Sequence, residues 1–302
     1  MQPAAFLPRI VPASAFAIRL SFLLLLLLLA FAGRAQVLTG TVTEASSAAG
    51  VPYANVGILG KGIGTVADDN GAFRLQYSEA NLLDTVRISS IGYRAQRMLL
   101  RDLVARPTVR LVAEAVALRG VQVKAKGLYK RTRTLGNTGN SESSTLTLDA
   151  HDLGAEIGTV ISLKHKPTKV LNANFNVAYN RAGSLMFRVN LYRLLPNGKP
   201  SNVKVVQRDI IVTTSVAKGP ITVDLTQDQL VLDEDFFLTL EWIGGADARN
   251  VSSKLAFSAS LGYTNNDLYL RDTSQAEWER ASAGAVLAGL QPRISFYVTV
   301  QD

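Results

Sequence analysis

After residue 37, hydrophobic and polar residues alternate along the chain with a period of two. In the first region, Phe73, Leu75 and Tyr77 alternate with polar neighbours, as do Val86 and Ile88. Successive side chains of a strand point to opposite faces, so this pattern predicts half-buried β-strands. Turn signals rich in Gly, Asp and Asn separate the strands at the spacing of about 8–12 residues that is typical of sandwiches. Residues 36–113 are therefore predicted to form a β-sandwich.

The alternation returns more strongly in residues 155–302. Strands are predicted around residues 171–179, 187–191, 221–225, 236–243 and 294–300. In the fourth of these, hydrophobic residues lie on both faces, which predicts a central strand that is covered on both sides. In the first, Leu171, Ala173, Phe175, Val177 and Tyr179 are predicted to share one face. Helical periodicity is confined to short pieces near 227–231 and 275–288. The region is thus predicted to be a second antiparallel, jelly-roll-like sandwich, and the fold class is all-β.

The segment 114–154 between these regions has a different composition. Between Glu114 and Glu142 it carries six basic residues and no acid, and it includes a Gly/Asn stretch and a Ser/Thr stretch. We interpret it as a basic linker, apart from one edge strand that Val121 and Val123 are able to form. A solvated connection is the simpler explanation of the charge run, and contact with an anionic surface or another protein is the alternative.

The N-terminal segment predicts export. Arg9 and Arg19 precede an apolar run from Leu20 to Gly33 that includes seven consecutive leucines, and a small-x-small site ends at Ala35. This order is typical of a cleaved signal peptide over residues 1–35. The rival interpretation is an uncleaved anchor, but 14 helical residues span only about 21 Å of a hydrocarbon core about 30 Å thick. Cleavage would leave a mature chain without a transmembrane segment.

Composition narrows the location and the partners. Without residues 1–35, the chain has 267 residues with 29 Lys and Arg against 24 Asp and Glu, which is weak support for a polyanionic partner, and nucleic acid is not expected. The chain contains no cysteine, so disulfides, thiolate metal sites and lipidation of an N-terminal cysteine are excluded. A Gram-negative periplasmic or outer-membrane-associated location is predicted, with secretion as a further possibility.

Four blocks of the first region resemble a known family. They are Gly40-Thr41-Val42, Pro52 with Ala54-Asn55-Val56, Gly64 to Phe73 (GTVADDNGAF), and Ser90-Ile91-Gly92-Tyr93. In this order and spacing they resemble the carboxypeptidase-like regulatory domain, a prealbumin-like β-sandwich of exported proteins of the Bacteroidota type. Ala67 and the order Val51-Pro52-Tyr53 depart from the pattern. The resemblance implies a folding or docking module without catalytic activity.

The block Asp68-Asp69-Asn70-Gly71 has a structural explanation that needs no ligand. Asp and Asn side chains bond to their own backbone, and Gly supplies a positive φ, so the block predicts a hairpin turn. Three adjacent oxygen-bearing side chains offer calcium ligands as an alternative, but the EF-hand spacing and its closing Glu are missing. We assign no metal and no cofactor.

The family resemblance requires a test for carboxypeptidase activity. A zinc carboxypeptidase needs H-x-x-E and a distant His, whereas the chain has two histidines, His151 and His165, and neither begins that motif. G-x-S-x-G and phosphate-loop motifs are also absent from the sequence. The acidic run Asp233-Glu234-Asp235 is interpreted as a solvated turn, with a carboxylate pair as the alternative. We therefore predict no catalytic residues.

These observations predict a non-catalytic interaction or scaffold protein of the cell envelope, whose partner is another envelope protein or a glycan. The alternative is a carbohydrate-binding accessory protein for polysaccharide uptake or processing. That alternative requires aromatic side chains exposed together in one groove. The available aromatics are Tyr179, Tyr192, Trp242, Tyr263, Tyr269 and Trp278.

Overall fold

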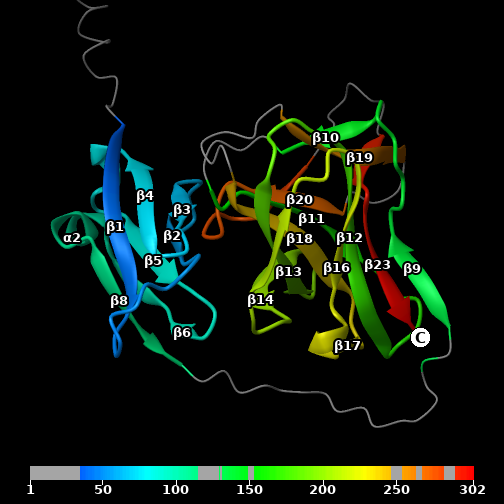
Figure 1. The fold of residues 1–302 in the computed structure, drawn as a ribbon, viewed down its shortest axis with the longest axis horizontal. Helices are drawn as coiled ribbons and strands as arrows, with labels where there is room; N and C mark the ends of the chain where they lie inside the picture. Colours follow the sequence, from blue (N-terminus) through cyan, green and yellow to red (C-terminus); the bar gives the residue numbers. More distant parts are fainter. Residues whose placement is uncertain are drawn as a thin grey trace, which may run out of the picture.

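The chain forms two β-sandwiches that lie side by side (Figure 1). The computed structural model describes residues 35–114, 129, 131–148, 153–245, 254–262, 267–281 and 290–302. We call residues 35–114 the first domain and the described residues from 131 onward the second domain. The all-β, two-sandwich fold class predicted from the sequence is confirmed.

The first domain consists of two four-stranded sheets, with strand orders β4-β1-β8-β6 and β3-β2-β5-β7. β1 pairs in parallel with β8, and the other pairings within these two sheets are antiparallel. The elements are β1 (Gln36–Glu44), β2 (Asn55–Ile58), β3 (Gly64–Val66), β4 (Ala72–Tyr77), η1 (Glu79–Asn81), β5 (Thr85–Ser89), β6 (Tyr93–Arg94), β7 (Gln96–Leu99), α2 (Leu100–Ala105) and β8 (Thr108–Ala113). The predicted strands at 73–77 and 86–89 match β4 and β5.

The Asp68–Gly71 block forms the turn that leads into β4. Asp68 Oδ1 accepts the backbone N–H groups of Asn70 at 2.9 Å and Ala72 at 2.8 Å. Gly71 has a φ of +78°, and a Cβ there would collide with the carbonyl oxygen of Val42. The return strand then buries Phe73 between the sheets. The turn chemistry predicted from the sequence is confirmed, but the prediction of a hairpin is wrong, because β3 pairs with β2 and β4 pairs with β1, so the turn joins the two sheets.

The second domain packs an eight-stranded sheet against a seven-stranded sheet. The orders are β10-β19-β12-β23-β9, with β16 and β17 on β12 and β22 on β19, and β14-β13-β18-β11-β20-β21, with β15 on β13. The elements are β9 (Thr132–Gly136), β10 (Thr145–Thr147), β11 (Glu156–Ile161), β12 (Thr168–Asn180), β13 (Leu185–Leu194), β14 (Pro200–Lys204), β15 (Ile210–Thr214), β16 (Gly219–Asp224), η2 (Thr226–Asp228), β17 (Val231–Leu232), β18 (Phe236–Gly245), β19 (Leu255–Gly262), β20 (Leu268–Arg271), β21 (Glu279–Arg280), β22 (Gln291–Ile294) and β23 (Phe296–Gln301).

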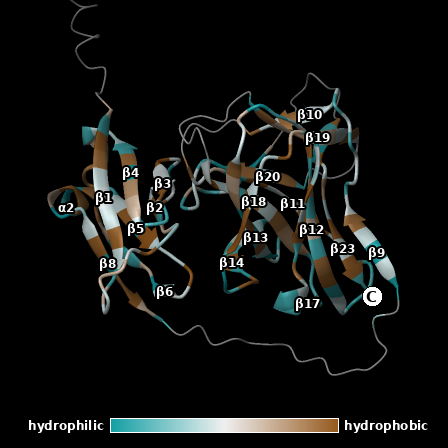
Figure 2. Cartoon of the chain, in the orientation of Figure 1, coloured by the Kyte–Doolittle hydropathy of each residue, from teal (hydrophilic) through white to brown (hydrophobic). Residues whose placement is uncertain are grey.

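The core of the second domain lies between its two sheets, and hydrophobic residues run along the paired strands (Figure 2). β18 contributes Phe236, Leu238, Leu240 and Trp242 to this core, and its opposite face is buried as well. The prediction of a central strand covered on both sides is therefore confirmed. The seven-stranded sheet lies between the first domain and the eight-stranded sheet (Figure 1).

In β12, the face predicted from alternation is interrupted twice. The register of β12 against β23 shifts between Val170 and Asn172, so Val170 is buried while Leu171 is only half-buried. A second shift against β19 lies between Val177 and Tyr179 and leaves Tyr179 half-buried. Each irregularity adds one residue to one strand and exchanges the faces beyond it, which simple alternation cannot detect.

Two strands lie inside the segment 114–154, for which the sequence predicts a linker. β9 pairs with β23 and β10 pairs with β19, so the second domain begins near Thr132 rather than at residue 155. Short strands rich in Thr have too little hydrophobic alternation to be recognised in the sequence. Val121, Val123 and most of the basic run lie outside the described residues. Helix α2 also lacks a counterpart in the sequence prediction, because six residues are too few to display a helical period.

Among the described residues, no helix is long and apolar enough to cross a membrane. The predicted signal peptide, apart from Ala35, lies outside the described residues.

Candidate functional site

The outer face of the seven-stranded sheet, which is turned toward the first domain, is the chemically richest part of the described structure. It buries Glu156, Arg188, Glu241 and Arg271, each less than 5% exposed, together with Asn190 and Thr239. These side chains come from β11, β13, β18 and β20, which are neighbours in the sheet. We call this set the ionic face. Charged groups at this depth need partners, because an isolated buried ion is strongly disfavoured.

Arg188 connects the ionic face to the first domain. Its Nη1 donates to Glu241 Oε2 at 3.0 Å, and its Nε lies 2.8 Å from Asp209 Oδ1. Its Nη2 donates to the backbone carbonyl of Tyr53 at 2.6 Å. Tyr53 has a φ of +53°, which is uncommon for a residue with a side chain. The unusual order Val51-Pro52-Tyr53 therefore places a carbonyl where the second domain can bind it.

A second pair, Glu156 and Arg271, occupies the other half of the ionic face. Arg271 Nη2 donates to Glu156 Oε2 at 2.5 Å and to the Tyr192 hydroxyl at 2.8 Å. The Arg271 guanidinium also lies 4.0 Å from the ring centroid of Trp278. Tyr192, Phe237, Tyr269 and Trp278 pack mainly edge to face around the pair. The aromatic cluster thus covers one side of the ion pair and strengthens its attraction there.

The electrostatics of the ionic face follow from burial and close opposite charges. Burial alone raises the pKa of Glu241, but Arg188, Lys204 and Arg271 outweigh it and hold the pKa below its ordinary value of 4.5. Burial, reinforced by the Glu156 carboxylate, raises the pKa of Tyr192 well above 10.0. Both residues therefore keep a fixed protonation state at neutral pH, Glu241 ionised and Tyr192 neutral.

A close backbone contact joins the domains beside the ionic face. The backbone N–H of Gly60 donates to the carbonyl of Gln275 at 3.0 Å, and Arg87 Nη1 donates to Gln275 Oε1 at 3.1 Å. Gly57, which pairs with Gly64 across β2 and β3, leaves room for Gln275, since a Cβ on Gly57 would lie 2.9 Å from Gln275 Cγ. Glycine-rich turn signals in the sequence do not reveal a contact of this kind, because it depends on a residue more than 200 positions away along the chain.

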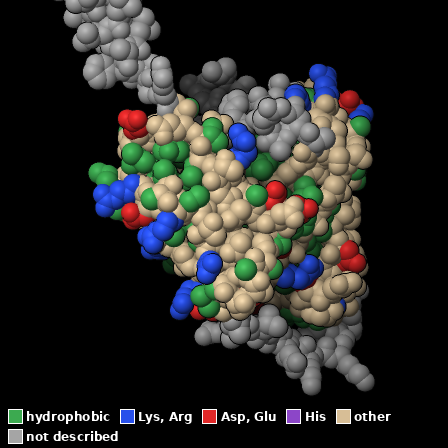
Figure 3. Space-filling view, turned by 60° about the vertical axis from the view of Figure 1, so that its left-hand side comes forward, with side chains coloured by type: hydrophobic (Ala, Val, Ile, Leu, Met, Phe, Trp, Pro, Cys, Tyr) green, Lys and Arg blue, Asp and Glu red, His purple; other side chains and the backbone are tan. Residues whose placement is uncertain are grey.

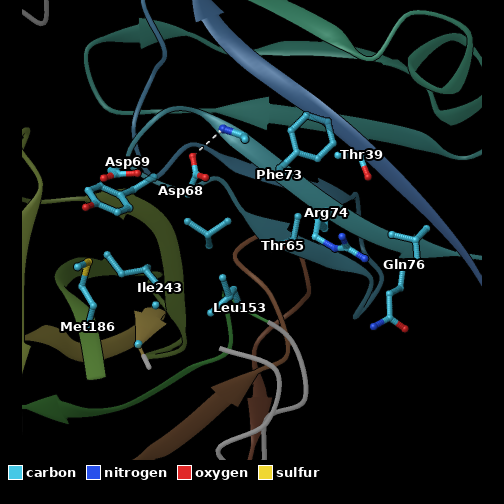
Figure 4. Close-up of a pocket in the computed structure, with 16 residues that line it drawn as sticks. Thr39, Thr65, Asp68, Asp69, Phe73, Arg74, Gln76, Leu153, Met186 and Ile243 are labelled. Carbon is cyan, nitrogen blue, oxygen red and sulfur yellow. Dashed lines mark hydrogen bonds between the residues drawn. The ribbon is translucent and has the colours of Figure 1, made fainter. Parts of the chain in front are cut away.

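Two cavities, both open to solvent, lie between the described parts of the domains. The first, of about 870 Å³, is lined by β1, β4 and the Asp68 turn on one side and by Leu153, Met186 and Ile243 on the other (Figure 4). Asp68 faces this cavity but is already bonded to its own turn, as the dashed line in Figure 4 shows. Among the described residues, no group of three or more His, Cys, Asp or Glu side chains is placed to hold a metal ion.

The second cavity, of about 610 Å³, lies over the ionic face, and we call it the basic cavity. Its first-domain wall includes Arg87 and Arg97, and its second-domain wall includes Arg188, Lys204 and Arg271. The acids on its lining are Asp209 and Glu277. Its volume falls within the range of small-molecule sites, roughly 300–1,000 Å³.

The aromatic residues considered for sugar stacking do not form an exposed platform in the part of the chain that the structure describes. Tyr192, Trp242 and Tyr269 are no more than 3% exposed. Tyr179 and Trp278 are half-buried, and Tyr263 lies outside the described residues. The carbohydrate-binding alternative requires aromatic side chains that are exposed together in one groove. Tyr192, Trp242 and Tyr269 do not meet this condition, because they are buried.

The other candidates considered in the sequence also occupy positions apart from the ionic face. His165 has a side chain that is 58% exposed, and His151 lies outside the described residues. The acidic run at 233–235 forms a bend before β18, where Asp235 Oδ1 accepts the backbone N–H of Leu163 at 3.1 Å. Its position agrees with the solvated-turn interpretation.

Taken together, the fold and the contact between its parts define a two-domain all-β protein whose first domain is a small sandwich docked on a larger one. Comparison with protein families finds one family that the first domain matches. Residues 38–123 match the family described as CarboxypepD_reg-like domain, as the sequence motifs indicate. That domain is a non-catalytic β-sandwich module. No curated protein matches the chain.

Similarity to solved structures is distant. The chain is similar to the cysteine protease and lectin-like domains of Cwp84, a surface layer associated protein of Clostridium difficile. The TM-score is 0.41 at 12% identity, over 56% of this chain and 36% of that one. It is also similar to a structure of infectious bursal disease virus, Gx strain, with a TM-score of 0.29 at 8% identity, over 88% of this chain and 63% of that one. Neither similarity bears on function.

Proposed function

We propose that the chain is a non-catalytic interaction protein of the cell envelope, exported by residues 1–35 and located in the periplasm or at the outer membrane. The observation that carries this proposal is the docking of a CarboxypepD_reg-like domain on a second sandwich through Arg188 and Tyr53. A polar contact of this kind suits a unit that presents both domains together to one partner. We propose another envelope protein as that partner.

The surface of the first domain is compatible with such a role. Val37, Leu83 and Val112 are exposed by 49%, 70% and 43%. Figure 3, which brings this side of the molecule forward, shows hydrophobic side chains beside separate Lys and Arg side chains. Hydrophobic groups interspersed with charges are common at transient protein interfaces, where the contact area is no more apolar than the rest of the surface.

The test is affinity capture of the tagged full-length protein after expression in a Gram-negative host, followed by mass spectrometry. Export predicts a mature N-terminus at Gln36 in the envelope fraction. Scaffolding predicts one protein captured at a stoichiometric yield, which an exported control with the same tag does not capture. An unprocessed N-terminus in the cytoplasm would overturn the localisation, and glycan captured without protein would overturn the choice of partner.

A further inference from the structure

The basic cavity carries positive charge that the described protein groups do not neutralise. Arg188 is paired with Glu241 and Asp209, and Arg271 is paired with Glu156. In all, five cations on the lining meet four acids, Asp209, Glu277 and the buried Glu156 and Glu241, which leaves one positive charge in excess. The cations without an ion pair are Arg87, Arg97 and Lys204. Among the described residues, no carboxylate lies within ion-pair distance of these three cations.

Arg87 and Arg97 face each other across β5 and β7. They are direct cross-strand partners, a position in which like charges destabilise a sheet. Arg87 is held in place by neutral acceptors, since its Nη1 donates to Ser89 Oγ and to Gln275 Oε1, both at 3.1 Å. These bonds orient the guanidinium without cancelling its charge. Burial and the neighbouring Arg97 both lower the pKa of Arg87, which agrees with a cation that has no anionic partner.

Lys204 brings a third charge from the opposite wall. It ends β14, is half-buried and lines the cavity near Arg188. Burial and the Arg188 charge lower its pKa. The Glu241, Glu156 and Asp209 carboxylates raise the pKa of Lys204 but do not fully offset these effects, and none of them forms an ion pair with its ammonium group. Lys204 therefore keeps hydrogen-bonding capacity for a ligand in the cavity.

The remaining lining favours a ligand with hydroxyl groups. Hydroxyls and amides dominate it, from Ser89, Ser90, Asn202, Gln207, Ser274 and Gln275. Asn55 lines the same cavity and is 9% exposed, and no donor among the described residues reaches its Oδ1 atom. A ligand hydroxyl would supply the donor that this buried acceptor lacks.

We propose that the basic cavity is a binding site for a small anionic sugar, whose phosphate or carboxylate contacts Arg87, Arg97 and Lys204. The recognition uses charge and hydrogen bonds rather than aromatic stacking. Because the site takes two cations from the first domain and one from the second, the bound anion bridges the domains and favours their docked arrangement. The proposal is independent of the envelope partner.

Calorimetric titration of the protein without its signal segment tests the site. The probes are glucose 6-phosphate, glucuronate, inorganic phosphate and, as the neutral control, glucose. At least one anionic sugar is expected to bind about tenfold or more tightly than glucose and inorganic phosphate, since a charged hydrogen bond in a sheltered site typically contributes that much. Glucose 6-phosphate and glucuronate distinguish a phosphate site from a carboxylate site.

Substitutions separate binding from folding. Lys204→Met is expected to weaken binding of the preferred sugar about tenfold while lowering thermal stability only slightly, because Lys204 supports the Glu241 carboxylate without forming an ion pair with it. Arg97→Gln should weaken binding similarly. Lys199→Met, the same change at an exposed lysine outside the cavity, should bind as the unchanged protein does. Failure of both anionic sugars to bind, equal binding of inorganic phosphate, or full binding by Lys204→Met would overturn the proposal.

Discussion

The two sandwiches of this protein bury different chemistry. Among the described residues of the first domain, the buried polar side chains are uncharged: Asn55, Thr65 and Asn81. The second domain buries four charged ones: Glu156, Arg188, Glu241 and Arg271. The difference arises from position, because these charges lie on the outer face of a sheet that the first domain and the aromatic cluster cover. A sheet face that would be solvated in a single sandwich becomes an interior when another domain docks on it.

The largest expected effect comes from removing one member of a buried ion pair. Arg188→Met leaves Glu241 ionised without its closest partner and should lower the free energy of unfolding of the second domain by about 3–5 kcal/mol. Urea denaturation followed by Trp fluorescence measures this change. The double variant Arg188→Met/Glu241→Leu should lose clearly less, since no unpaired carboxylate remains. Equal losses in the two variants would contradict the ionic account.

The first domain should instead be sensitive at its turn. Gly71→Ala forces a side chain into a left-handed conformation and against the Val42 carbonyl, at an expected cost of about 2 kcal/mol or more. Gly60→Ala is the matched control, because Gly60 also has a positive φ of +70° but open space around its Cβ position. Calorimetric melting should show a smaller loss for Gly60→Ala, about 1–2 kcal/mol. Similar losses would mean that the Val42 contact is unimportant.

Acid should affect the second domain through Glu241. The pKa of Glu241 is lowered in the folded protein, so its contribution to stability is present above its ordinary pKa of 4.5 and is lost as the pH falls from 4.5 through the folded value. Melting temperatures measured from pH 7 to pH 3 should therefore fall more steeply below pH 4.5 for the unchanged protein than for Arg188→Met/Glu241→Leu. Parallel curves would show that the pair does not control acid stability.

The smallest effect is expected at the contact between the domains. Gly57→Val suits a strand but places side-chain atoms where Gln275 lies. Stability should change by less than about 1 kcal/mol, while the radius of gyration from small-angle X-ray scattering should increase. Adding Gln275→Ala makes room and should restore the compact form. If the radius of gyration of Gly57→Val is unchanged, the contact between Gly57 and Gln275 does not control how closely the domains dock.

Much of the fold could be predicted because its strands obey local rules. Alternation identified β4, β5, β13, β16 and β18, and the Asp68–Gly71 turn has side chains that act on their own backbone. The β-bulges of β12 and the short strands β9 and β10 depend on partners far along the chain, so local patterns do not reveal them.

The ionic face was missed for a similar reason. Arg188 and Glu241 are 53 residues apart, and Glu156 and Arg271 are 115 apart, so each looks like an ordinary solvent-facing residue of its own strand. One signal was present in the sequence: Glu241 lies on the same face of β18 as Phe237 and Ile243. Large hydrophobic neighbours on a charged face indicate that something covers it. The aromatic residues were recognised, but sequence alone could not distinguish an exposed stacking platform from a packed cluster.

The position of β23 has a consequence for the order in which the chain folds. This strand, Phe296–Gln301, lies between β12 and β9 in the interior of the eight-stranded sheet, and it buries Phe296, Val298 and Val300. The sheet therefore has a gap in its middle until residue 301 has left the ribosome. A nascent chain in that condition has no completed second domain, because β12 and β9 are still without the strand that lies between them.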